Sequence, residues 1–567
     1  MMRQFAALFS LRQIAALFSL RQFAAVAVAA LCACGKPASH ETPDAGGAPP
    51  PKVTVCPNAP APGPCTATKA GAGLLITGTL LLPGEIVRGG ALAVDATGKI
   101  TCAGCDCTNP GASTIVCGSA VVSPALVNPH DHIDYDQNPP LADSGERYEQ
   151  RSDWRLGLRG HTKLDVRGGA TAVQQIWIEL RGVMAGTTST IGAAGTPGLL
   201  RNLDRGLDEG LNHQAASYDT FPLGDLDGTQ LTSGCAYPAI EPESKIAGDS
   251  AYLPHVAEGV DDVARNEFVC LTSTANGGQD LAQPQSAFIH SVALEANDYE
   301  LLSTDKTSMV WSPRSNVRLY GATADVVTAS RTHARIALGT DWLASGSMNL
   351  LRELRCADSL NQRWSSWFTD EQLWLMVTRD AAAVTGYGDV LGVLQTGYAA
   401  DVAIFDASAH ADHRAILDAN PQDVLLVLRG GVPLYGESAI IDVLTGGGCD
   451  ALNVCGAMKS ACLMSDVNQT LAGLMAQGAN AYPLFFCDAP PDEPTCTPMR
   501  GASVGGSSTY TGMPASGDRD GDGVPDATDD CPDDFNPIRP LDHGAQADAD
   551  HDGRGDVCDP FTFDPKG

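Results

Sequence analysis

The chain has 567 residues, 44% of them hydrophobic, and a formal net charge of −31 from 67 acidic and 36 basic side chains. This length exceeds one ordinary domain and allows a large core. The acidic balance excludes a nucleic-acid-binding protein, because contact with the phosphate backbone needs a basic surface. We therefore expect a mostly globular protein of several domains, with no nucleic-acid partner.

Residues 1–33 are predicted to be a signal peptide. The repeat RQFAALFSL, RQIAALFSL, RQFAAV runs into an Ala-rich stretch and then into Leu31-x-Ala33-Cys34. This box is typical of bacterial lipoproteins, with Cys34 as the lipidated residue, and an ordinary secretory signal is the alternative. The apolar run is too short and too often interrupted by Arg to span a membrane. We expect an exported lipoprotein of the bacterial cell envelope, in the outer membrane or the periplasm, with its lipid anchor in the membrane.

Residues 34–65 are rich in Pro, Ala and Gly, a composition that cannot bury a core, so we expect a flexible tether. Of the 18 cysteines, two lie at the end of the leader, which leaves an even number for an exported chain and favours disulfides. Cys102-x-x-Cys105-x-Cys107 indicates either a zinc site or a disulfide-stapled loop. The absence of a matching second Cys or His pair favours the disulfides.

Residues 66–122 are predicted to form part of a small β-sandwich, with strands at 74–82, 85–87, 91–94 and 120–122 between Gly and Pro turns. Similar runs, GYAADVAIFDAS and DVLLVLRGGVPLYGE, recur in residues 389–445. We expect the two flanks to build one β domain around a larger domain inserted between them.

Residues 123–388 alternate strand-like and helix-like runs, and this pattern is typical of a (β/α)8 TIM barrel. The fold class is therefore α/β. In such a barrel the chemistry lies at the carboxyl ends of the strands. The strand-like runs are 187–192, 251–257, 287–292, 308–311 and 335–339.

Metal-ligating residue types follow several of these runs. The segment VVSPALVNPHDH ends in His130 and His132, whose i, i+2 spacing puts both imidazoles on one side of a strand. His255 and His290 end two later runs, and Asp341 ends a third. Together with the His-x-His pair, these residues favour one shared metal site.

Each later residue also has a simpler interpretation. His255 taken alone is equally a buried, hydrogen-bonded histidine, and Asp341 could cap a helix. Glu258 follows His255 by three residues and adds a carboxylate to the same strand end. The remaining histidines considered lack a companion motif and are interpreted as structural or exposed: His161, His213 and His333.

These motifs resemble the amidohydrolase superfamily of metal-dependent hydrolases, in particular its deaminase and chlorohydrolase branch. The resembling segments, in order, are VNPHDH, HVAE, FIHS, WSPRSNVRLYG, ALGTDW and GYAADVAIFD, spread over residues 72–440. Two features depart from the family pattern. Pro129 and Asp131 stand where a small residue and Thr are more common, and the insert 134–165 is unlike the small-base deaminases.

The resemblance implies a single divalent metal, zinc or alternatively iron or manganese, that activates a water molecule. It implies that Asp341 also accepts a proton from this water and that Glu258 carries a proton to the leaving nitrogen. His290 would orient the water or polarise the carbon under attack. Lys163 and Lys245 end no apolar run, so a second metal held by a carboxylated lysine is less favoured. The implied ligands are His130, His132, His255 and Asp341.

Two further segments are candidates for the walls of the pocket. Ser315 and Asn316 follow the strand that ends at Trp311, and they either contact substrate or brace the loop. The insert is a candidate cover for the pocket through four of its residues: Tyr148, Trp154, Arg159 and His161.

Residues 446–515 contain five cysteines among Gly, Ala and Pro, and we expect a disulfide-stapled extension that is mostly helical or irregular. Residues 516–560 contain two runs of the form DxDxDGxxD, together with Cys531 and Cys558. They resemble thrombospondin type 3 calcium repeats, and a disordered acidic tail is the alternative. The resemblance implies two or three calcium ions. The implied ligand sets are Asp518, Asp520, Asp522 and Asp526, and Asp548, Asp550, Asp552 and Asp556.

The sequence therefore predicts an exported, lipid-anchored metallohydrolase that attacks a non-peptide C–N bond of a small molecule. Deamination of an amino-heterocycle and hydrolysis of a cyclic amide are the favoured reactions. The alternatives are a hydrolase with another leaving group, chloride or N-acyl, and a surface binding lipoprotein that has lost catalysis. The sequence does not predict the oligomeric state.

Overall fold

The computed structural model describes residues 49–566. The predicted signal peptide, Cys34 and the first part of the predicted tether lie outside the described residues. None of the helices in the described part combines the length and apolar character needed to cross a bilayer.

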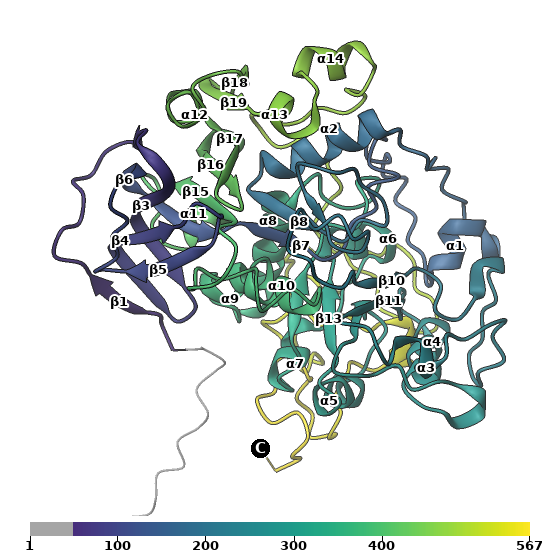
Figure 1. The fold of residues 1–567 in the computed structure, drawn as a ribbon. Helices are drawn as coiled ribbons and strands as arrows, with labels where there is room; N and C mark the ends of the chain where they lie inside the picture. The colour runs from purple at the N-terminus through teal and green to yellow at the C-terminus, as the bar shows by residue number, and fades with distance from the viewer. Residues whose placement is uncertain (1–48, 567) are drawn as a thin grey trace, which may run out of the picture. The chain divides into compact units, whose positions relative to one another are not determined.

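Within residues 49–566, one 11-stranded sheet combines both flanks of the barrel segment (Figure 1). β6 and β15 pair antiparallel and join the two flanks, so segments about 280 residues apart in sequence share hydrogen bonds. In β3, buried and half-buried residues alternate, which is the pattern of a strand with one face in a core. The strands are β1 (Lys52–Val55), β2 (Thr66–Thr68), β3 (Gly71–Leu82), β4 (Glu85–Val94), β5 (Ile100–Gly104), β6 (Ala112–Pro124), β15 (Val402–Asp406), β16 (Val424–Arg429), β17 (Val432–Glu437), β18 (Asp450–Val454) and β19 (Ala457–Ala461).

The two flanks thus share one sheet, whereas the two-layer sandwich stays a prediction. The predicted strands 85–87 and 91–94 are one strand, β4. Gly89 has a φ of 67°, and the pairing of β3 with β4 shifts register here. Gly89 therefore lies in a bulge inside a continuous strand, and not in a turn between two strands.

The flexible-tether prediction needs correction for residues 52–65. β1 pairs with β4 along its whole length, and two disulfides fasten the segment, Cys56–Cys105 and Cys65–Cys117. The Pro-rich segment has no core of its own, as its composition predicts. Its disulfides and its pairing with β4 fix it to the sheet instead.

The described part of the middle segment contains a five-stranded and a three-stranded parallel sheet, eight strands in all. Backbone hydrogen bonds connect the two sheets on both sides, from Ala216 N to Leu203 O (3.0 Å) and from Asp341 N to His130 O (3.0 Å). This α/β arrangement is consistent with a (β/α)8 barrel. The strands are β7 (Leu126–Asn128), β8 (Thr187–Thr190), β9 (Arg201–Asn202), β10 (Ser217–Asp219), β11 (Tyr252–Val256), β12 (Ala287–His290), β13 (Ser308–Trp311) and β14 (Ile336–Leu338).

Helices follow most of these strands and pack around them (Figure 1). Their starts carry local signals, such as the capping box of Thr171 and Gln174 at α2 and the proline at the first position of α6. The α-helices are α1 (Arg151–Leu156), α2 (Ala172–Val183), α3 (Glu243–Ile246), α4 (Asp262–Leu271), α5 (Ala296–Thr304), α6 (Pro313–Tyr320), α7 (Val326–Arg331), α8 (Leu350–Asn361), α9 (Asp370–Met376), α10 (Arg379–Val384), α11 (Arg414–Leu417), α12 (Ser438–Thr445), α13 (Leu463–Val467) and α14 (Leu471–Ala476).

The extension 446–515 is mostly irregular, which is one of the two predicted alternatives, and it contains two short helices, α13 and α14. The strands β18 and β19 form a hairpin that lengthens the large sheet. Its turn residues Cys455 and Gly456 both have positive φ, as a tight two-residue hairpin requires. A disulfide also joins the extension to the barrel, from Cys496 to Cys356 in α8. The tail then runs along the barrel (yellow in Figure 1).

Every cysteine in residues 49–566 is paired, which confirms the disulfides predicted from the sequence. Cys102 and Cys105 bond to different partners, Cys107 and Cys56, so the triplet is a stapled loop. The eight disulfides are Cys56–Cys105, Cys65–Cys117, Cys102–Cys107, Cys235–Cys270, Cys356–Cys496, Cys449–Cys462, Cys455–Cys487 and Cys531–Cys558.

Candidate active site

The predicted metal-site and catalytic residues of the barrel converge at the carboxyl ends of its strands. Parallel strands of a barrel end at one face, so side chains distant in sequence meet there. All of them are at most 4% exposed except His132, whose side chain is 16% exposed. They are His130 and His132 after β7, His255 and Glu258 at and after β11, His290 at the end of β12, and Asp341 after β14.

The potential ligand atoms lie close enough together to share one cation. Atoms of His130, His132 and Asp341 lie within 4.8 Å of one another, and so do atoms of His130, His255 and His290. Nε2 of His130 and Nε2 of His255 are buried without a hydrogen-bond partner. Burial lowers the pKa of both imidazoles well below the ordinary value, so they are neutral, as metal ligands must be. Unpartnered buried nitrogens with free lone pairs fit a metal site.

Hydrogen bonds on the other ring nitrogen distinguish His255 from His290. Nδ1 of His255 donates to the carbonyl of Asp219 (3.2 Å), which leaves the lone pair on Nε2. Nδ1 of His290 lies 3.1 Å from the amide nitrogen of Asn316, whose amide oxygen accepts from Thr323 (3.3 Å). The amide therefore donates to Nδ1, and Nε2 of His290 carries the proton. This makes His255 the better metal ligand and His290 the better proton donor.

Asp341 lies between two imidazoles and a serine. Its Oδ1 is 3.3 Å from Nε2 of His132 and 3.5 Å from Nε2 of His130, and its Oδ2 accepts from Ser315 (2.6 Å). Burial alone would raise the pKa of Asp341, but the imidazoles outweigh burial and hold this pKa well below the ordinary value. Its φ of 56° is rare for a non-glycine residue, and such backbone strain is concentrated at functional sites. Asp341 caps no helix, because α8 begins at Leu350 with Asn349 as its cap.

Glu258 has the environment of a group that exchanges protons near neutral pH. Its Oε1 accepts from the hydroxyl of Tyr320 (2.7 Å), and its Oε2 is 3.6 Å from Nε2 of His290. Burial, followed by the charge of Asp341, raises the pKa of Glu258 to about 7. A carboxyl group with this pKa can both hold and release a proton at neutral pH.

α6 and its N-cap residue supply four polar contacts to the site. The N-cap Ser312 contacts His130 (2.9 Å), and three residues of the helix contact site residues, Ser315 to Asp341, Asn316 to His290 and Tyr320 to Glu258. Ser315 and Asn316 thus hydrogen-bond to the site residues Asp341 and His290, a role that differs from both predicted alternatives, substrate contact and loop bracing. Sequence reasoning missed the role of Tyr320. The signal was present, since positions 312, 315, 316 and 320 share one side of a helix.

A cavity of about 360 Å³ opens over these residues and is suited in size to a small molecule. Its lining includes the aromatic rings of Tyr135, Trp154, Phe221 and Trp342, and the ring centres of Trp154 and Trp342 are 5.2 Å apart. Such walls suit a flat ring. Lys163 also lines this cavity.

Among the four insert residues predicted to cover the pocket, only Trp154 lines the cavity. The prediction is wrong for the other three, because their side chains make contacts away from the cavity. Tyr148 is buried, Arg159 pairs with Asp153 and Asp261, and His161 bonds to Glu146 and Glu149.

Three other residues that the sequence offered as possible metal ligands lie outside the ligand cluster. His213 hydrogen-bonds to Asp389 (3.0 Å), His333 is exposed, and Lys245 pairs with Glu241 (2.8 Å). These three have structural or surface roles.

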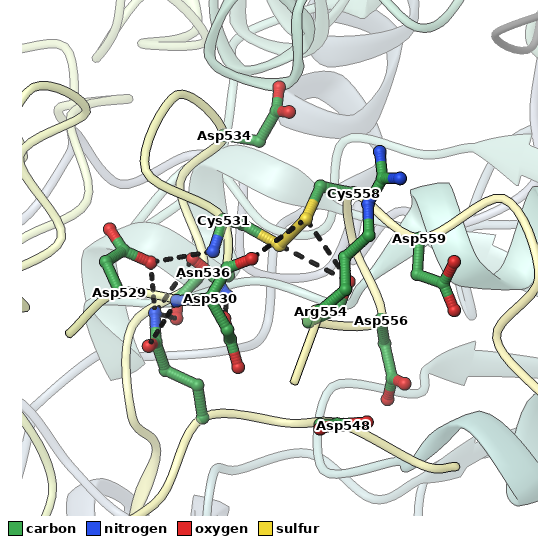
Figure 2. Close-up of a disulfide and its surroundings, with 12 residues drawn as sticks. Asp529, Asp530, Cys531, Asp534, Asn536, Asp548, Arg554, Asp556, Cys558 and Asp559 are labelled. Carbon is green, nitrogen blue, oxygen red and sulfur yellow. Dashed lines mark hydrogen bonds between the residues drawn. A yellow bond between two sulfur atoms is a disulfide. The ribbon is translucent and has the colours of Figure 1, made fainter. Parts of the chain in front are cut away.

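The two acidic runs of the tail form loops that gather carboxylates. Oxygens of Asp518, Asp520 and Asp522 lie within 4.8 Å of one another, and oxygens of Asp548, Asp550 and Asp552 do so in the second loop. The fourth predicted member of each set accepts a backbone N–H from its own loop, Asp526 from Arg519 and Asp556 from Ala549. Figure 2 shows the disulfide that fastens this region, with Asp529, Asp530, Asp548 and Asp556 around it.

Residues 254–434 match the family model "Amidohydrolase family". A 5-methylthioadenosine/S-adenosylhomocysteine deaminase of Caldicellulosiruptor saccharolyticus is 22% identical over 246 residues, which are 40% of this chain and 56% of that protein. A protein of the same name from Halobacterium salinarum is 24% identical over 423 residues, 64% of this chain and 92% of that protein. A solved triazine hydrolase variant aligns with a TM-score of 0.50 and 16% identity, over 73% of this chain and all of that one.

The structural likeness shows the fold alone. The match covers just over half the length of the first relative and nearly all of the second. The chain is thus similar to the amidohydrolase family over residues 254–434, and to two proteins named as deaminases over 40% and 64% of its length.

Proposed function

We propose that this protein is an exported, metal-dependent hydrolase that removes an amino group from a heterocycle, or opens a cyclic amide, by attack of water on the carbon. The observation that carries the proposal is the convergence of a buried histidine cluster and Asp341 with Glu258, whose pKa of about 7 suits proton transfer. A binding protein has no need for such a carboxyl group beside the cluster.

The metal would be held by a ligand set of neutral imidazoles and one carboxylate, a set that suits zinc: His130, His132, His255 and Asp341. When bound, the metal supplies Lewis-acid chemistry that makes water a nucleophile near neutral pH. The two nitrogens without partners and the ionised Asp341 support this assignment.

The other residues move protons and orient the substrate. Asp341 accepts a proton from the attacking water as the new C–O bond forms. Glu258 delivers a proton to the nitrogen as the C–N bond breaks, so that ammonia or a ring amine leaves neutral. Nε2–H of His290 donates to the ring atom beside the carbon under attack and stabilises the charge that develops there. The aromatic walls hold the ring flat.

Release of ammonia from a panel of aminopurines, aminopyrimidines and cyclic amides tests the proposal, with the purified full-length chain and a dye-coupled or enzymatic readout. Cyclic amides are followed by loss of ring absorbance, and chlorotriazines by chloride release. Turnover of one C–N substrate that disappears in Glu258→Gln supports the proposal. Chloride release alone would favour the chlorohydrolase alternative, and no turnover in metal-loaded protein would favour an inactive binding lipoprotein.

Two further parts of the proposal concern the ends of the chain. The eight disulfides support export, because such bonds form in oxidising compartments, while lipidation at Cys34 rests on the sequence box.

The acidic loops would bind calcium. In support, Asp520 is only 8% exposed and its Oδ2 has no partner, and burial with mutual repulsion raises the pKa of Asp522 to about 8. Oxygen-only sites suit a hard cation.

A further inference from the structure

Near its C-terminal end, the extension 446–515 reaches the segments that surround Glu258 through one buried side chain, Arg500. Its Nη1 donates to the carbonyl of Tyr320 (2.7 Å) and to that of Tyr148 (3.2 Å), and its Nη2 pairs with Glu149 (2.5 Å). Arg500 is only 3% exposed. A planar guanidinium with several donors is suited to join three acceptors in this way.

The segments that Arg500 joins are also joined to one another. Tyr148 N donates to the carbonyl of Leu319 (2.9 Å), and Val260 N donates to that of Glu149 (2.7 Å). A third bond links the insert to the proposed proton donor directly, from Arg151 N to the carbonyl of Glu258 (3.1 Å). Arg500 therefore lies at the junction of three chain segments, 148–151, 258–260 and 319–321.

Tyr320 lies at this junction. Tyr320 is fully buried, receives a hydrogen bond from Trp154 (2.8 Å) and donates to Glu258. A shift of the backbone at Tyr320 would move its hydroxyl away from the carboxyl group. Catalysis by proton transfer depends on such geometry at the scale of one ångström.

Three further contacts bring residues 510–541 to the same side of the barrel. Nη1 of Arg539 donates to the carbonyl of Leu294 (2.9 Å), in the loop that follows His290, and Leu541 N donates to the carbonyl of Val260 (3.1 Å). Tyr510 donates to the carbonyl of Gly321 (3.2 Å).

We propose that residues 500–541 are a positioning element of the active site, in which Arg500 fixes Tyr320 against Glu258 and Arg539 fixes the loop after His290. The catalytic part of this proposal rests on the proposed function. The alternative is a surface module that shares the chain with the barrel and leaves its loops unaffected.

Hydrogen exchange, followed by mass spectrometry on the full-length chain, tests the positioning claim without a substrate. In Arg500→Lys the ammonium can still pair with Glu149, but it cannot also hold both carbonyls, so the protein should stay folded. We expect at least tenfold faster exchange in peptides covering 148–151, 258–261 and 317–322. The matched control is Arg554→Lys, because Arg554 is exposed on the second acidic loop, and it should leave these peptides unchanged. Faster exchange confined to the tail in Arg500→Lys would overturn the proposal.

Kinetics test whether positioning matters for the reaction. With the substrate found by the ammonia assay, we expect kcat of Arg500→Lys to fall about tenfold and KM to stay within about twofold, since the pocket walls are untouched. Loosened loops with unchanged kcat would overturn the catalytic part. If the wild-type protein turns over nothing, the proposed function fails, while the exchange experiment still decides the structural part.

Discussion

The hydroxyl of Tyr320 and the carboxyl group of Glu258 form a 2.7 Å hydrogen bond inside the barrel mouth. Both side chains are buried, and Glu258 also lies 3.6 Å from His290. The bond uses Oε1 and leaves Oε2 without a bond to Tyr320, and Glu258 lines the cavity. A proton donor held at one oxygen and available at the other is suited to serve a leaving group.

The first prediction concerns this pair. Glu258→Gln should keep the metal and lower kcat by about 10²- to 10⁴-fold, the usual contribution of general acid–base catalysis. Tyr320→Phe should lower kcat less, because Glu258 keeps its proton but loses its orientation. Metal content and steady-state kinetics on the same preparations check both. A fully active Glu258→Gln protein would refute the assigned role.

A second prediction follows from the tautomer of His290. Asn316→Asp replaces an N–H donor by a carboxylate acceptor, which requires the proton on Nδ1 and removes it from Nε2. We expect kcat to fall about 10- to 100-fold, the range for residues that orient ligating and catalytic histidines. Asn316→His, whose ring N–H can still donate, is the companion variant. Unchanged kcat in Asn316→Asp would mean that Nε2–H of His290 donates to nothing in the reaction.

A third prediction concerns pH and stability. Glu179 is fully buried and its Oε2 has no partner, and burial raises its pKa to about 8. A carboxyl group with a raised folded-state pKa favours folding when protonated. Its contribution is therefore complete below about pH 4.5 and is lost progressively up to about pH 8, at about 1.4 kcal/mol per pH unit.

Glu179→Gln mimics the protonated acid, so it should flatten the loss of stability between pH 5 and pH 8 measured by chemical denaturation. Glu300→Gln, at an exposed position, is the control and should keep the wild-type slope. An unchanged slope in Glu179→Gln would show that this group does not govern the pH dependence.

A fourth prediction concerns the tail. Asp520→Asn should weaken calcium binding to the first acidic loop at least tenfold, because it removes charge from a buried oxygen without a partner. Calorimetric titration with calcium should find about two sites in the wild-type chain. Asp564→Asn, at an exposed position near the C-terminus, should bind as wild type does. No calcium binding by the wild-type chain would refute the predicted ligand sets.

The sequence located the site better than it located the elements around it. His130 and His132 are recognisable from their spacing, and His255, His290 and Asp341 each end a run whose apolar character marks a strand. The two-residue β9 and three-residue β10 are too short to show any periodicity. The Gly residues between 85–87 and 91–94 predict a turn, whereas Gly89 lies in a bulge, because bulges and turns favour the same residue.

Contacts distant in sequence gave no signal at all. Arg500 is 180 residues from Tyr320 and 352 from Tyr148, and nothing in the local sequence pairs them. The position of Tyr320 beside the site could have been predicted, because its spacing from Asn316 and Ser312 places the three residues on one side of a helix. Composition predicts a flexible tether because it indicates only that a segment cannot fold alone. It does not show that Cys56 and Cys65 form disulfides with partners 49 and 52 residues away, which fix the segment to the sheet.

Elemental analysis of the purified full-length chain tests the central claim most directly. The account predicts about one zinc or other divalent transition metal per chain, which is lost in the His130→Ala, His132→Ala double variant and retained in His213→Ala. Calcium in the tail is measured as a separate element and does not interfere. Well-folded protein without a transition metal, even after incubation with zinc, would contradict the account.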